Sequence, residues 1–261
     1  LYFGGTRGAA HFYDIQNHRT RWFREDRDSR GHPFYTGAWR APSNNTNTFA
    51  RESQMDILAA AAGKDPLEFR LEHLGDNPKM ARVLEEGAEK FGWTPSGGQG
   101  KRGSGKTGSK GYGMACGIDA GTYVAVFLEA EVNETDGKVQ VIRAVVCQDM
   151  GMVVNRQGAI IQAEGCVNMG LGYALSEEVE FEGRRMLSRN FDSYDIAHIS
   201  WTPEVSVVLV DVQDEPSQGG GEPAIICMGG AIANAIFDAT GARLYQQPMN
   251  PARILEALSV K

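Results

Sequence analysis

Residues 218–236 read QGGGEPAIICMGGAIANAI, so one carboxylate, Glu222, stands between three glycines and a run of apolar and small residues. Glycine lets the backbone approach a ligand closely, and a proline suits the first turn of a helix. The pattern predicts a rigid loop leading into a helix over about residues 224–240, with Glu222 projecting from the junction. The carboxylate there either carries out chemistry or only stabilises the helix N-terminus through its dipole.

Three consecutive helices are predicted well upstream of this motif. Apolar residues recur at helical spacing after Thr46 or Asn47, either of which suits the N-cap, and Gly63 suits the end of that helix. Asp65-Pro66 and Asn77-Pro78 each combine a cap with a first-turn proline, which predicts two further helices ending near residues 75 and 92. The forty residues before them are expected to form loops and short strands.

The middle of the chain is predicted to change from a linker to strands. Residues 94–113 hold eight glycines among serines and lysines, a composition typical of a linker. Apolar runs on either side of Asp136-Gly137 predict a hairpin, and helical spacing returns over residues 160–175. We expect an arginine-loop and three-helix segment over 1–93, a linker over 94–113, and an α+β segment over 114–261. The predicted fold class is α+β, with mixed sheets and packed helices.

The composition excludes several classes of partner. A net charge of −7 with interspersed signs argues against nucleic acid and against anionic membrane surfaces. The chain lacks an apolar run long enough to cross a bilayer and lacks the pattern of a signal peptide, so we expect a soluble, cytoplasmic protein. Its four cysteines show no metal-binding spacing and are expected to be buried free thiols.

A second glycine cluster formally matches a phosphate-binding loop. Residues 100–107 read GKRGSGKT, in which backbone amides and the lysine would bind phosphate. A working phosphate loop lies between a buried strand and a helix, whereas glycine, serine and lysine flank this one. A flexible basic linker explains the segment better than a nucleotide-binding site does.

Three ordered motifs together resemble the xanthine dehydrogenase and aldehyde oxidase family, in the C-terminal part of its molybdopterin-binding large subunit. The glutamate motif of residues 218–236 is the last of them. Before it come DMGMVVN at 149–155, IQAEG at 161–165 and MGLG at 169–172. The first is WRAP at 39–42, which leads to FARESQMD at 49–56 and DPLEFR at 65–70. The resemblance covers nearly the whole chain from Trp39 onward.

This resemblance implies a molybdenum hydroxylase that oxidises an N-heterocycle or an aldehyde, with water as the source of oxygen. Glu222 matches the general base that takes a proton from the hydroxide on the molybdenum. Gln162 matches a glutamine that binds the pterin, Arg40 matches an arginine bordering the metal, and Gly220 and Gly221 belong to the cofactor-binding loop. No protein atom is expected to ligate the metal. Gln162 could instead be a surface residue, and Arg40 could be a structural arginine stacked near Trp39.

The resemblance also implies that this chain does not act alone. The other half of the large subunit contributes two segments that bind the cofactor, a glycine-aromatic loop and an M-G-Q-G-type segment. Neither segment is recognisable in this sequence. The molybdenum–molybdopterin would therefore be shared with a second half or subunit, while iron–sulfur clusters and FAD would belong to partner chains. Without them we expect an inactive chain with Glu222 in an open cleft or interface. A non-catalytic fragment or scaffold that keeps the fold is the main alternative.

Overall fold

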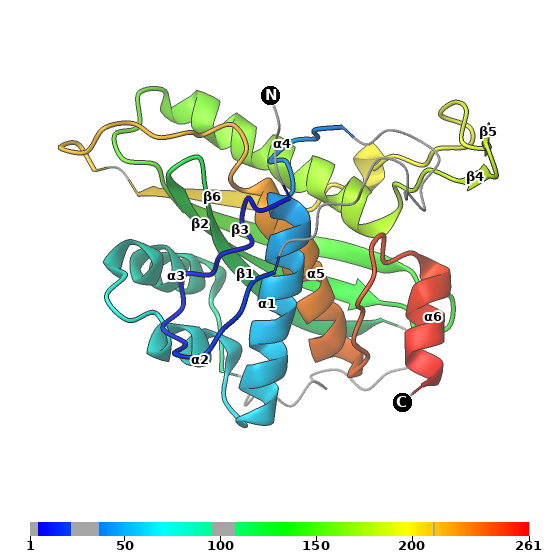
Figure 1. The fold of residues 1–261 in the computed structure, drawn as a ribbon, viewed down its shortest axis with the longest axis horizontal. Helices are drawn as coiled ribbons and strands as arrows, with labels where there is room; N and C mark the ends of the chain where they lie inside the picture. The colour runs from blue at the N-terminus through cyan, green and yellow to red at the C-terminus, as the bar shows by residue number, and fades with distance from the viewer. Residues whose placement is uncertain (1–4, 22–36, 96–107, 211, 261) are drawn as a thin grey trace.

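Helices cover both faces of a four-stranded sheet in the computed structural model, which describes residues 5–21, 37–95, 108–210 and 212–260 (Figure 1). The sheet order is β1-β2-β3-β6, with β1 to β3 antiparallel and β6 parallel to β3. The strands are β1 (Ser109–Asp119), β2 (Thr122–Val132), β3 (Val139–Asp149) and β6 (Glu204–Val210). The sheet is therefore mixed, and the predicted α+β class is confirmed.

Two helices, α4 (Arg156–Leu175) and α5 (Ile225–Thr240), cover one face of the sheet, and the terminal helix α6 (Pro251–Ser259) lies beside them (Figure 1). Val124, Val126 and Leu128 of β2 point into this core, whereas Ala125 and Phe127 point to the opposite face. Because both faces are covered, β2 reads as a nearly continuous apolar run.

The other face is covered by the N-terminal helices α2 (Pro66–Glu72) and α3 (Pro78–Phe91), together with part of α1 (Asn44–Ala61). Met80 and Leu84 of α3 are buried in the same cluster as Phe127 of the sheet. In Figure 1, α1 crosses in front of α5 and joins the two groups of helices. The predicted three-helix segment therefore shares its core with the sheet and does not fold around a core of its own.

The expected linker over residues 94–113 extends too far, because β1 begins at Ser109. Gly111 and Gly113 lie in this strand, directly against the backbone of α5 at Ala235 and Ala231. A side chain at either position would overlap that backbone. These glycines therefore allow close contact between helix and strand. The glycine-rich composition predicted a linker here, and for Gly111 and Gly113 that prediction is wrong.

The other predicted elements differ from the structure mainly at their ends. Helix α1 begins at Asn44 with Ser43 at the N-cap position, so the predicted caps Thr46 and Asn47 both lie inside the helix. The Asn47 side chain donates instead to the backbone oxygens of Gly5 and Arg7. The caps at Asp65 and Asn77, and the hairpin of β2 and β3, are confirmed, although α2 ends earlier than predicted, at Glu72. After α4 come the short strand β4 (Phe181–Glu182), which pairs with β5 (Arg185–Met186), and a 3-10 turn, η1 (Ile199–Trp201). The phosphate-loop pattern at 100–107, like residues 22–36 of the opening segment, lies outside the described residues.

A buried ion network joins α1 to α2. The Nε atom of Arg70 donates to Glu52 at 3.0 Å and its Nη1 atom donates to Asp56 at 2.7 Å, and the Arg70 and Glu52 side chains are completely buried. Although burial acts to raise the pKa of Glu52, Arg70 and Arg51 outweigh it and lower that pKa. Tyr13 donates to Glu52 at 3.0 Å, so the N-terminal segment is attached to the same network.

Candidate functional site

Hydrogen bonds from two neighbouring turns fix the glycine loop before Glu222. The turn between β1 and β2 contributes the Ala120 oxygen, which accepts from the Gly219 amide at 3.0 Å, and the Thr122 hydroxyl, which donates to the Gly219 oxygen at 2.6 Å. After β3, the Met150 oxygen accepts from the Gln218 amide at 2.8 Å. The loop is therefore held at the edge of the sheet where β1 and β3 end.

Glu222 lies between this loop and α5, as predicted. Its backbone oxygen accepts from the Ile225 amide at 3.1 Å in the turn that opens the helix. Its side chain is 38% exposed, and its Oε2 atom accepts a hydrogen bond from Arg7 at 3.1 Å. The carboxylate is thus accessible and turned toward an arginine, rather than hydrogen-bonded to the first amides of α5.

Arg40 joins the glycine loop to α4. Its Nε donates to the Gly221 backbone oxygen at 3.0 Å, and its Nη2 donates to that oxygen and to Oε1 of Gln162, the latter at 2.9 Å. Its Nη1 contacts the Met169 sulfur at 3.1 Å. Trp39 packs instead on Tyr173, with 5.4 Å between ring centroids. The structure therefore brings Arg40, Gln162, Gly221 and Glu222 together from three distant parts of the sequence.

The two predicted cofactor-binding glycines differ in their surroundings. A β-carbon added at Gly220 would overlap the Met150 side chain, whereas one added at Gly221 would meet nothing within 4 Å. Gly220 therefore packs against the end of the Met150 side chain. Gly221 leaves open space beside Glu222, where a ligand has access to the backbone.

A buried thiol lies beneath the loop. The Cys166 sulfur on α4 is 3.6 Å from the Gly221 oxygen and 3.7 Å from the Glu222 oxygen. Burial raises the pKa of this thiol, so at neutral pH it is a neutral packing group. All four cysteines are free and buried, as expected.

Sequence reasoning missed three residues of this site: Arg7, Asp119 and Asn44. Arg7 lies in the irregular N-terminal segment, Asp119 ends β1, and Asn44 opens α1, where the helix start was placed too late. Arg7 contacts Asp119 at 2.8 Å, and Asp119 accepts from Asn44 at 2.7 Å. No short-range pattern links these residues, because 112 positions separate Arg7 from Asp119.

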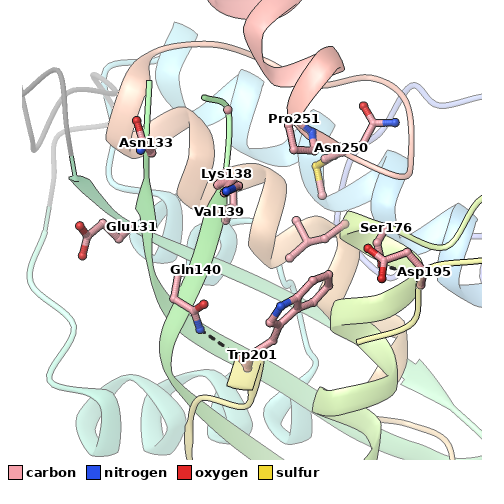
Figure 2. A pocket seen from close by; sticks show the side chains of 13 residues that line it. Glu131, Asn133, Lys138, Val139, Gln140, Ser176, Asp195, Trp201, Asn250 and Pro251 are labelled. Carbon is pink, nitrogen blue, oxygen red and sulfur yellow. Dashed lines mark hydrogen bonds between the residues drawn. The ribbon is translucent and has the colours of Figure 1, made fainter. Parts of the chain in front are cut away.

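A separate cavity of about 560 Å³ lies at the opposite end of the sheet, where β2 and β3 are joined (Figure 2). Its polar groups already serve the fold. Figure 2 shows Gln140 directed to Trp201, whose backbone oxygen it reaches at 3.3 Å, and the Ser176 hydroxyl donates to the Asp195 oxygen at 2.9 Å. Asn250 caps α6. None of the predicted site residues lines this cavity.

Comparisons with known proteins identify the family of this chain. The profile of the molybdopterin cofactor-binding domain family matches residues 71–203, a range that includes Gln162. One of the subunits of nicotinate dehydrogenase from Pseudomonas putida is 35% identical over 87% of this chain and 20% of its own length. A membrane-bound aldehyde dehydrogenase of Gluconacetobacter polyoxogenes, named for pyrroloquinoline quinone, is 30% identical over 96% of this chain and 33% of its own.

A solved structure shows the same fold. The aldehyde oxidoreductase of Desulfovibrio gigas superposes with a TM-score of 0.70 over 85% of this chain and 42% of its own, at 18% sequence identity. The chain belongs to the molybdopterin-binding xanthine dehydrogenase family. It spans about a fifth to a third of the length of the two relatives named above.

Proposed function

We propose that this chain forms part of the molybdopterin site of a molybdenum hydroxylase, in which Glu222 is the general base. The observation that carries the proposal is the meeting of Glu222, the Gly221 backbone, Arg40 and Gln162 at one accessible position. These residues come from the three motifs on which the family resemblance rests. Their convergence is what a shared cofactor site requires, and a helix-capping role for Glu222 alone does not explain it.

The donor set suits a pterin cofactor. Oε1 of Gln162 accepts from Arg40, while among the described residues its amide nitrogen has no hydrogen-bond acceptor. An amide in this state can donate to a heterocyclic ligand. The open space at Gly221 admits a ligand close to the backbone, and Gly220 keeps the loop packed on Met150. When bound, the cofactor supplies the two-electron oxidation and activates water as the source of oxygen.

As general base, Glu222 contributes a carboxylate whose Oε1 or Oε2 atom accepts the proton that is released from the activated water. Proton transfer to a positioned side chain accelerates a reaction by about 10²- to 10⁴-fold. With a side chain 38% exposed, Glu222 still has access to water in this chain. We therefore expect a partner to complete the pocket and to exclude that water.

The surface beside the site suits such a partner. Met169, Ile161 and Ile199 are 39%, 54% and 92% exposed. Met169 and Ile199 line an open cleft of about 400 Å³ between α4 and residues 196–202. Exposed apolar side chains that line a cleft together, as Met169 and Ile199 do, mark protein interfaces. We assign this surface to the second molybdopterin-binding half or subunit, which supplies the rest of the cofactor site.

Electrons released at the molybdenum must reach an acceptor outside this chain. The four cysteines are buried, and the described residues contain no cluster of three or more side chains that could ligate an iron–sulfur centre. The proposal therefore includes an iron–sulfur partner and a flavoprotein with FAD. By the names of its relatives, the substrate is a small N-heterocycle, as in nicotinate dehydrogenase, or an aldehyde.

The test uses the complex purified with its partner chains. Molybdenum, pterin and pyrroloquinoline quinone are quantified, and turnover is measured for the wild type, Glu222→Gln and Glu85→Gln. Glu85 is an exposed residue of α3, far from the site in sequence, and serves as the control. We expect stoichiometric molybdenum in all three proteins and a fall in kcat of about 10²-fold or more only in Glu222→Gln.

Two outcomes contradict the assignment. If Glu222→Gln retains wild-type turnover, Glu222 is not the base. If it loses molybdenum, the residue acts structurally in cofactor binding. A complex containing pyrroloquinoline quinone and no molybdenum would instead refute the proposal that the cofactor is molybdenum–molybdopterin.

A further inference from the structure

Arg7 bridges two carboxylates at the site. Its Nη2 atom donates to Oδ2 of Asp119 at 2.8 Å and to Oε2 of Glu222 at 3.1 Å. The Asp119 side chain is completely buried, while Arg7 and Glu222 are 31% and 38% exposed. One nitrogen atom thus connects a buried anchor to the carboxylate of the proposed base.

The anchor itself is fixed in place. Oδ1 of Asp119 accepts from Nδ2 of Asn44 at 2.7 Å, and the same nitrogen donates to the Ile118 oxygen at 3.1 Å. Oδ1 of Asn44 accepts from the Thr48 hydroxyl at 3.0 Å. Asp119 therefore cannot turn away from Arg7 without breaking contacts at the start of α1.

The backbone on both sides of Arg7 is also held. The Arg7 oxygen accepts from Asn47 at 2.8 Å, and the Gly8 oxygen accepts from Arg51 at 2.8 Å. Gly8 has a φ of +75°, and a β-carbon there would overlap the Asn44 side chain. Only glycine fits this contact, so the segment presents Arg7 in a defined position.

We propose that Arg7 is a positioning residue, which holds the Glu222 carboxylate toward the β1–β2 turn and balances the charge of Asp119. This inference rests on the proposed function of Glu222. Two carboxylates that share one guanidinium nitrogen lie close enough to repel each other once that cation is removed. Without Arg7, the partly exposed Glu222 side chain turns toward solvent, because buried Asp119 cannot move.

The first test measures kinetics in the assembled complex for Arg7→Gln, Arg7→Lys and Arg19→Gln. Arg19 is an exposed arginine of the same segment and serves as the matched control. Misplacing a catalytic group by about 1 Å costs up to 10²-fold in rate. We expect kcat to fall about 10-fold in Arg7→Gln with little change in KM, and Arg7→Lys to recover most of it.

The second test needs no cofactor. Glu222 in the full, cofactor-free chain is labelled with a water-soluble carbodiimide and an amine, and the rate is read by peptide mass spectrometry. We expect faster labelling in Arg7→Gln and the wild-type rate in Arg19→Gln. In Arg7→Gln/Asp119→Asn, kcat should recover in part because the repulsion is gone, an effect that loss of a purely structural contact does not produce.

The two proposals fail in different ways. If Glu222→Gln abolishes turnover while Arg7→Gln matches Arg19→Gln in kcat and labelling, only the role of Arg7 is refuted. If Glu222→Gln remains active, the proposed function itself is wrong. A failure of Arg7→Lys to recover any of the kcat lost in Arg7→Gln also overturns the positioning role.

Discussion

The chain contains two arginine–carboxylate clusters, and they differ in burial. Arg70, Glu52 and Asp56 form a closed network in which the Arg70 and Glu52 side chains are completely buried. Arg7, Glu222 and Asp119 form an open network in which only Asp119 is buried. Burial makes the first cluster a determinant of folding, because a charge left alone there has no access to water. The protein can lose one contact of the second cluster and remain folded, so Glu222 is available to act on a ligand.

Replacing Arg70 is the strongest way to break the closed cluster. Arg70→Met leaves Glu52 and Asp56 buried without their shared cation, so we expect the free energy of unfolding to fall by about 3–5 kcal/mol. Chemical denaturation of the cofactor-free chain measures this loss. Arg82→Met, at an exposed position of α3, should stay within about 0.5 kcal/mol of the wild type. Equal effects of the two substitutions would mean that the buried network does not stabilise the fold.

A pair of glycine substitutions sharpens the same contrast between core and site. Gly113→Ala places a methyl group against the backbone of α5 and should reduce the free energy of unfolding by about 1–3 kcal/mol. Gly221→Ala meets open space, so we expect normal stability. The molybdenum content of the complex should nevertheless fall in Gly221→Ala, because the methyl group occupies the space proposed for the ligand. If the Gly221→Ala complex is stable and has the wild-type molybdenum content, Gly221 does not belong to the cofactor site.

At neutral pH the smallest expected effect concerns a buried thiol, which contributes to the pH dependence of stability only under alkaline conditions. Burial raises the pKa of Cys147 to about 12, above the value of 9.0 for a free thiol. At pH 9 roughly a thousandth of the folded thiol is ionised, against about half in the unfolded chain. Between pH 9 and 12 the unfolded state therefore loses protons that the folded state keeps, and this group's contribution to stability falls as the pH rises. Alkylation of Cys147 at pH 9 should be negligible in the native protein and fast after denaturation; rapid native labelling would contradict its burial.

Local signals in the sequence predicted much of the fold. Capping residues with a following proline located α2 and α3, and the Asp136-Gly137 turn located the hairpin, because these structures depend on neighbouring residues. The start of β1 was missed for the opposite reason. Gly111 and Gly113 are explained only by their contact with α5, more than 100 positions later in the chain.

The candidate site divides in the same way. The sequence by itself determined Glu222 as a candidate through its glycine motif and the α+β class through periodic patterns. Gln162 and Arg40 became candidates because their motifs resemble those of the family. Only the tertiary structure decided that Arg40 contacts both Gly221 and Gln162, and that Arg7 joins Glu222 to Asp119. Contacts of this kind depend on how helices pack against the sheet, and short-range sequence patterns do not encode that packing.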